Sequence, residues 1–152
     1  MIDKRQFRDM INEVTTYLGI QNKTGTNLLM GTAAQESKLG TYFKQIGEGP
    51  ALGIFQMEPN TEKDIWENYL NYNQKLKNKI NTLLWTSGIK ELQYNIAYQI
   101  AIARMQYYRH SEPLPKPDNI WGLALYWKKY YNTPLGKGTT EEFVDNYQRY
   151  VI

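Results

Sequence analysis

Apolar side chains recur every three or four residues along most of the chain, which is the spacing of one face of an α-helix. Near the amino terminus, Phe7, Ile11 and Val14 follow this spacing. We therefore predict an amphipathic helix over residues 4–18, ended by Gly19, because glycine readily adopts the left-handed conformation at a helix C-terminus.

A second helix is predicted over residues 26–39, stopped by Gly40. Leu29, Ala33 and Glu36 fall on one stripe of this helix. Because the rest of the stripe is largely apolar, the carboxylate of Glu36 is expected to point inward with the apolar face.

Residues 40–59 are rich in Gly and Pro and carry no sustained period, so we predict an irregular loop with room for a short strand pair. Thr61, with Asp64 three residues later, resembles a capping box and predicts the start of the next helices. Those helices are expected to break near residues 71–73 and again at residues 87–88.

Residues 89–108 are apolar on more than one side, which predicts the central and most buried helix. The proline-rich stretch 111–117 ends it. Asp118 is expected to cap a further helix to about residue 131, and Thr139 opens a capping box for a last helix. Six to eight helices with almost no alternating strand pattern predict an all-α fold, α-dominated α+β at most.

Length and composition favour one domain over residues 1–152. The chain carries 13 Tyr and 4 Trp, which is rich in aromatic residues for its size. The formal charge is only +3, and the basic residues are scattered, so we expect no nucleic-acid partner. We expect a monomer.

The absence of cysteine excludes thiol-based zinc and redox sites. His110 is the only histidine, so we expect neither a metal site nor a cofactor. The amino terminus is charged throughout and no apolar run reaches membrane-spanning length, so we expect no secretion signal and no membrane insertion.

Glu36 is the first candidate for chemistry. A carboxyl group on the inward face of a helix is desolvated, and desolvation raises its pKa. A carboxylic acid that stays protonated near neutral pH can protonate the leaving oxygen of a glycosidic bond. On the residues alone, the alternative is a helix carboxylate that turns to water or pairs with a lysine.

Two motifs strengthen the catalytic hypothesis. The string AAQES at residues 33–37 resembles the Glu-Ser motif of goose-type lysozymes and soluble lytic transglycosylases. The string ALGIFQMEP at residues 51–59 is similar to that family's second motif, at a comparable distance downstream. The resemblance implies a lysozyme-like domain that cleaves the β-1,4 bond between N-acetylmuramic acid and N-acetylglucosamine in peptidoglycan, with Glu36 as general acid.

A third family motif, Ala-x-Tyr-Asn before a glycine-rich turn, has two possible counterparts. Tyr131 and Asn132 precede such a turn but lack the Ala. Ala124 and Tyr126 fit the first half, but Trp127 stands where Asn belongs. We favour Tyr131, because the Asn and the turn follow it as in the family.

The resemblance implies roles for further residues. Ser37 would help to orient Glu36, Gln56 would contact sugar, and Tyr131 would hydrogen-bond near the acid. The backbone leading to Phe55 would line the cleft. Aromatic rings stack on the flat C–H faces of sugars, and we expect one or two of the following to do so: Tyr42, Phe43, Phe55, Tyr126 and Trp127.

A second carboxylate decides the mechanism. Both hydrolytic routes normally require one, whereas a transglycosylase uses the sugar's own hydroxyl. We rank Glu48 first, because it lies in the flexible loop near the expected cleft, ahead of Glu58, Glu62 and Asp64. The sequence leaves the two routes open.

The rival hypothesis is a catalytically silent glycan-binding or virion structural domain on the same scaffold. The presence of Glu36, Ser37 and Gln56 argues against it, because a binding module has no need of an inward acid. A small, cysteine-free domain without a signal peptide resembles a bacteriophage endolysin or virion-associated lysin. Such a protein would be made in the host cytoplasm and would reach the cell wall after holin release or as part of a virion.

Overall fold

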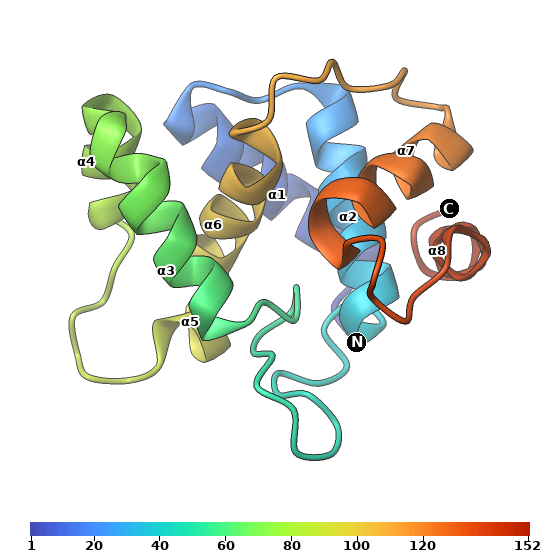
Figure 1. Ribbon diagram of the computed structural model, residues 1–152, viewed down its shortest axis with the longest axis horizontal. Helices are drawn as coiled ribbons and strands as arrows, with labels where there is room; N and C mark the ends of the chain where they lie inside the picture. The colour runs from blue at the N-terminus through green and yellow to red at the C-terminus, as the bar shows by residue number, and fades with distance from the viewer.

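Eight α-helices form the protein in the computed structural model, which describes residues 1–152 (Figure 1). A 3-10 turn lies at Leu70–Tyr72 and a π-helical turn at Lys128–Asn132. There is no β-sheet, so the predicted all-α class is confirmed. The helices are α1 (Lys4–Leu18), α2 (Lys23–Ser37), α3 (Pro59–Asn68), α4 (Gln74–Asn81), α5 (Glu91–Tyr94), α6 (Ile96–Tyr108), α7 (Ile120–Trp127) and α8 (Thr140–Tyr150).

Helices α2 and α6 occupy the middle of the molecule. In Figure 1, α3 and α4 lie on one side of this pair, and α7 and α8 lie on the other. Helix α6 packs against α1, α2 and α3, and every residue from Tyr98 to Tyr107 is buried. Burial on all sides explains why α6 is apolar all round, and the prediction of a central, most buried helix is confirmed.

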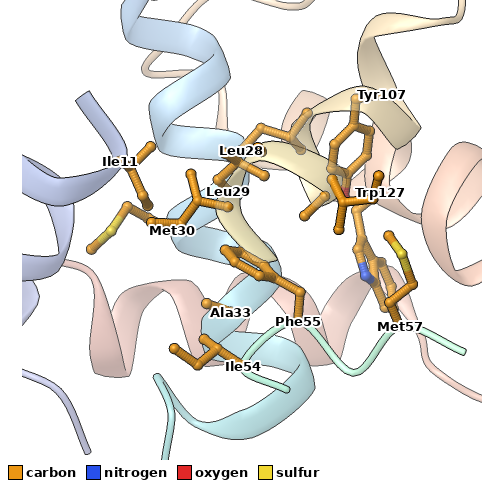
Figure 2. Packing of buried hydrophobic residues seen from close by; sticks show 14 of the residues in the cluster. Ile11, Leu28, Leu29, Met30, Ala33, Ile54, Phe55, Met57, Tyr107 and Trp127 are labelled. Atoms are coloured by element: carbon orange, nitrogen blue, oxygen red, sulfur yellow. The ribbon is translucent and has the colours of Figure 1, made fainter. Parts of the chain in front are cut away.

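The long loop between α2 and α3 contributes four side chains to the hydrophobic core, namely Leu39, Ile54, Phe55 and Met57. Ile54 and Phe55 are buried, and Figure 2 shows both near Ala33 of α2. The ring of Phe55 also packs against Phe7 of α1, with 6.0 Å between centroids. Each fully buried side chain of this size stabilises the fold by roughly 1.5–3 kcal/mol. The loop is thereby fixed against the C-terminal half of α2.

Helix α1 has its predicted bounds and its Gly19 cap, but α2 is displaced toward the amino terminus. Asn22 caps α2 by accepting a hydrogen bond from the backbone N–H of Gly25 at 2.6 Å, so the helix starts before the predicted position. Lys38 and Leu39 take left-handed backbone angles, with φ of 51° and 57°, so the helix ends short of the predicted end. The prediction missed an asparagine cap.

Helix α3 begins at Pro59, so the capping box predicted at Thr61 and Asp64 is wrong. Proline is favoured in the first helical turn, where its missing N–H sacrifices no hydrogen bond. The break predicted near residues 71–73 is confirmed by the 3-10 turn. Helix α4 ends at Asn81, earlier than predicted.

The segment predicted as one helix over residues 89–108 is split by Asn95. Its side chain caps α6 by accepting a hydrogen bond from the backbone N–H of Tyr98 at 3.1 Å. Helix α7 is capped by Asn119 rather than by the predicted Asp118. Asparagine thus sets the starts of α2, α4, α6 and α7, since its side-chain oxygen satisfies a free N–H of the first turn.

The carboxyl-terminal third departs from a regular helix at one point. Helix α7 ends at Trp127 and continues as the π-helical turn, rather than as one helix to residue 131. Thr139 caps α8 as predicted, because its hydroxyl accepts a hydrogen bond from the backbone N–H of Glu142 at 3.1 Å. None of the helices combines the length and apolarity needed to cross a bilayer.

Candidate functional site

A cavity of about 620 Å³ opens where the C-terminus of α2 meets the long loop, the start of α3 and the π-helical turn. Most of its lining side chains are polar. Three of them carry charge, namely Glu36, Glu58 and Lys137. The full lining consists of Glu36, Tyr42, Gln45, Ala51, Gln56, Met57, Glu58, Thr61, Gln106, Tyr131, Asn132, Thr133, Gly136 and Lys137.

Glu36 lies in the last turn of α2, partly buried in the cavity wall. The indole Nε1 of Trp127 donates a hydrogen bond to its Oε1 at 3.0 Å. Glu36 forms no salt bridge. Burial raises the pKa of Glu36 to about 7, although the bond from Trp127 favours the carboxylate. The alternative of a fully solvated or lysine-paired carboxylate is therefore excluded.

Trp127 is fixed by packing from both sides. It is completely buried, and its ring lies 5.4 Å from that of Phe143 in α8. A Cβ atom at Gly138 would lie 2.7 Å from the edge of the indole, so the backbone approaches the ring closely there. Figure 2 shows the indole among the buried side chains of the core. The indole N–H is thus held in place to donate to Glu36.

Tyr131 lines the cavity, and its hydroxyl donates to the backbone rather than to Glu36. Its hydroxyl donates to the carbonyl of Phe55 at 2.7 Å, and its ring stacks on Tyr107 with 5.4 Å between centroids. Burial, with the nearby charge of Glu36 as a further cause, raises the pKa of Tyr131 well above its ordinary value. Tyr131 stays neutral and ties the π-helical turn to the loop beside the acid.

Ser37 acts on the loop and not on substrate. It is completely buried, its Oγ donates to the carbonyl of Ile54 at 2.6 Å, and the backbone N–H of Gly40 donates to it at 2.8 Å. The Ser37 hydroxyl hydrogen-bonds only to backbone groups, so its expected role in orienting Glu36 is wrong, and its burial excludes contact with substrate. Through these two hydrogen bonds, Ser37 connects the start of the loop at Gly40 and its later part at Ile54 to the C-terminus of α2.

Gln56 lines the cavity and also holds its own turn. Its backbone is left-handed, with φ of 47°, and its Nε2 donates to the carbonyl of Gly53 at 2.8 Å. Tyr42 reaches the same cavity, and its hydroxyl donates to the backbone carbonyl of Glu36 at 2.9 Å. Of the five aromatic candidates, Tyr42 is the one in the lining.

The side chains of Phe55 and Tyr126 lie outside the cavity lining, so their assignment as substrate contacts is wrong. The ring of Phe55 faces the core, and its backbone carbonyl accepts the hydrogen bond from the Tyr131 hydroxyl. The hydroxyl of Tyr126 donates to the carbonyl of Glu112 at 2.9 Å. Because neighbouring helical residues point about 100° apart, Trp127 rather than Tyr126 faces α2.

The second carboxylate in the cavity lining is that of Glu58, not of the first-ranked Glu48. Glu48 is exposed and is not part of the cavity lining, whereas Glu58 lines the cavity immediately before α3. The other two candidates are engaged elsewhere. Glu62 accepts a hydrogen bond from the Tyr98 hydroxyl at 2.6 Å, and Asp64 pairs with Arg109 at 2.7 Å.

Sequence reasoning missed two features of the site. The sequence suggested Trp127 only as a sugar-stacking ring, and the stretch that contains Lys137 only as a turn before the last helix. Trp127 lies four residues before Tyr131 in the segment predicted as one helix, and this spacing relates the two side chains to each other but not to Glu36. No group of three or more His, Cys, Asp or Glu side chains is placed to hold a metal ion.

Comparisons with protein-family models, curated proteins and solved structures returned no match. The chemistry of the site therefore rests on its own geometry. That geometry offers a desolvated carboxylic acid, a fixed N–H donor for its conjugate base, a second carboxylate and a polar cavity. Such a site can protonate a leaving group and leave a stabilised carboxylate behind.

Proposed function

We propose that this protein cleaves the β-1,4 glycosidic bond between N-acetylmuramic acid and N-acetylglucosamine in peptidoglycan, with Glu36 as general acid. The observation that carries the proposal is the state of Glu36. Its pKa of about 7 keeps a substantial fraction protonated at neutral pH, and it faces an open polar cavity large enough to hold sugar rings.

The first step uses only Glu36 and Trp127. Oε1 of Glu36 accepts the indole hydrogen bond, which leaves Oε2 to carry the proton. That proton passes to the glycosidic oxygen as the bond to the sugar carbon breaks, and the electron pair of that bond stays on the leaving oxygen. The indole N–H then stabilises the carboxylate that forms.

The second step depends on the nucleophile. With Glu58 as general base, a water molecule attacks the cationic sugar carbon and a reducing end results. Without a base at Glu58, the C6 hydroxyl of the same sugar attacks, its proton returns to Glu36, and a 1,6-anhydro end results. The anhydro route returns the proton to Glu36 directly. The hydrolytic route leaves Glu58 protonated and Glu36 ionised, and proton exchange with bulk water through the open cavity restores the starting state.

The test is digestion of purified peptidoglycan, followed by mass spectrometry of the soluble muropeptides. Wild-type protein is expected to release muropeptides, and Glu36→Gln is expected to release none. Glu48→Gln is the matched control, because it removes a carboxylate outside the cavity lining, and it is expected to match the wild type. Reducing ends that disappear in Glu58→Gln identify the hydrolytic route, and 1,6-anhydro ends identify the other.

The proposal fails if wild-type protein releases nothing, or if Glu36→Gln releases as much as the wild type. A protein that binds the polymer without cleaving it would be the glycan-binding domain of the rival hypothesis. The identity of the products also decides whether Glu58 belongs to the reaction.

A further inference from the structure

Lys137 is the only basic side chain that lines the cavity. It forms no salt bridge, although the cavity also contains the carboxylates of Glu36 and Glu58. The pKa of Glu36 is set by burial and by Trp127, and Lys137 has no part in it. The Lys137 ammonium is therefore a free positive charge in the same cavity as the acid, neither paired with it nor a cause of its raised pKa.

The segment that carries Lys137 is held by a second lysine. Nζ of Lys128 donates to Oδ1 of Asn132 at 2.6 Å, to the carbonyl of Gly136 at 2.8 Å and to the carbonyl of Gly138 at 2.7 Å. The two carbonyls belong to the residues on either side of Lys137. The backbone at Lys137 is thus clamped, while its own side chain is left exposed along the cavity.

The backbone held by Lys128 also contacts the residue that donates to the acid. Gly138 lies directly against Trp127, the donor to Glu36, because a Cβ there would come within 2.7 Å of the indole. The backbone that carries Lys137 and the acid are therefore both held against Trp127, and a ligand bound by the Lys137 ammonium lies in the cavity that Glu36 lines.

We propose that Lys137 is a specificity-determining residue that binds a carboxylate on the glycan, so that the site takes acidic, carboxylate-bearing glycan in preference to neutral N-acetylglucosamine polymer. This inference rests on the proposed function. In peptidoglycan the carboxylate has two sources: the peptide stem, and the lactyl group of those muramic acid residues that carry no stem, since elsewhere the lactyl carboxyl is an amide. A neutral polymer offers the ammonium no ionic partner, whereas a carboxylate forms a charge-assisted hydrogen bond with it.

Binding is the readout that separates this inference from catalysis. In an inert Glu36→Gln background, Lys137→Gln is compared with Lys75→Gln, which removes the same charge from the exposed face of α4. The probes are intact peptidoglycan, glycan strands freed of stem peptides, and chitin oligosaccharide. We expect Lys137→Gln to weaken binding to intact peptidoglycan about fivefold and to leave chitin binding unchanged. High salt is expected to shrink the difference.

The probes also separate the two carboxylate sources. Removal of the stems frees the lactyl carboxylates. Loss of the Lys137 effect on peptide-free strands therefore assigns the contact to the stem, and retention shows that Lys137 binds a free lactyl carboxylate. An equal loss on chitin, an equal loss in Lys75→Gln, no loss at all, or no measurable binding to peptidoglycan overturns the inference. If wild-type protein cleaves nothing while the binding difference persists, the proposed catalysis fails and the Lys137 contact stands.

Discussion

At the scale of single residues, Glu36 is governed by two opposing influences. Burial in the wall of the cavity favours the neutral acid, whereas the indole N–H of Trp127 favours the carboxylate. Burial is the larger, so the pKa of Glu36 lies near 7 instead of 4.5. The effect of burial can be tested by substitution of Glu36, and the effect of the hydrogen bond by substitution of Trp127.

The raised pKa predicts a pH-dependent stability. Because the folded protein holds the Glu36 proton more tightly than the unfolded chain, stability falls as pH rises from about 4.5 to about 7 and is then constant for this group. Glu36→Gln is neutral throughout, so it should exceed wild-type stability at pH 8 by up to about 3 kcal/mol and equal it at pH 4. Urea unfolding at both pH values measures this, with Glu48→Gln as the control that shows no such change.

Removal of the indole donor predicts a shift in the pH profile of activity. Trp127→Phe keeps an aromatic ring but loses the N–H that stabilises the carboxylate, so the pKa of Glu36 should rise further. The alkaline limb of kcat/KM, which reports the free protein, then moves to higher pH. A limb that stays in place, or moves to lower pH, would contradict the assigned role of Trp127.

At the scale of elements, the loop of residues 38–58 is held in place without a sheet. Lys44 pairs with Leu52 and Leu52 with Met57 as isolated bridges, so the strand pair allowed for in the sequence is not formed. The anchors of the loop include Ser37, the buried ring of Phe55, and the backbone N–H of Ile54, which donates to Oε1 of Gln99 at 2.7 Å. The position of Gln56 in the cavity depends on these anchors.

Ser37→Ala is expected to loosen this loop. It leaves the buried carbonyl of Ile54 and the N–H of Gly40 without their side-chain partner, which costs about 1–3 kcal/mol of stability. Hydrogen exchange at the amide of Gly40 should accelerate. Thr41→Ala removes an exposed hydroxyl in the same loop and should leave that exchange unchanged. Equal exchange rates in the wild type and Ser37→Ala would refute the anchoring role.

The sequence predicted the presence and approximate bounds of most helices, but it did not predict which side chains meet between helices. The inward position of Glu36 followed from helical periodicity, which is local. Trp127 lies 91 residues away in the chain, and no local pattern predicts that its N–H meets this acid. The choice between Glu48 and Glu58 depended on the path of an irregular loop, which periodicity does not describe. Missed asparagine caps account for most errors in helix starts.

At the scale of the whole molecule, the site depends on how α8 seats against α2. Gly31 of α2 is in close contact with α8, since a Cβ there would lie 2.4 Å from Phe143 and 2.9 Å from Tyr147. Phe143 in turn packs on Trp127. Gly31 thus supports the acid from a distance, through two aromatic rings.

Gly31→Ala is expected to push α8 outward. The added methyl overpacks the interface, which costs about 1–3 kcal/mol of stability, and displaces the ring on which Trp127 rests. Thermal unfolding measures the cost, and the indole ¹⁵N–¹H resonance of Trp127 reports the displacement. An unchanged melting temperature together with an unchanged resonance would show that α8 does not determine the position of the indole.

The indole that contacts Glu36 has a consequence for proton traffic. An indole nitrogen donates a hydrogen bond but neither accepts nor releases a proton at neutral pH. The Tyr131 hydroxyl, whose pKa is raised well above the ordinary value, and the Tyr42 hydroxyl each donate to a backbone carbonyl and so form no relay to the acid. Glu36 therefore has no neighbouring side chain among these three that can supply it with a proton. Under the proposed chemistry, any proton that a turnover does not return to Glu36 is replaced from bulk water through the open cavity.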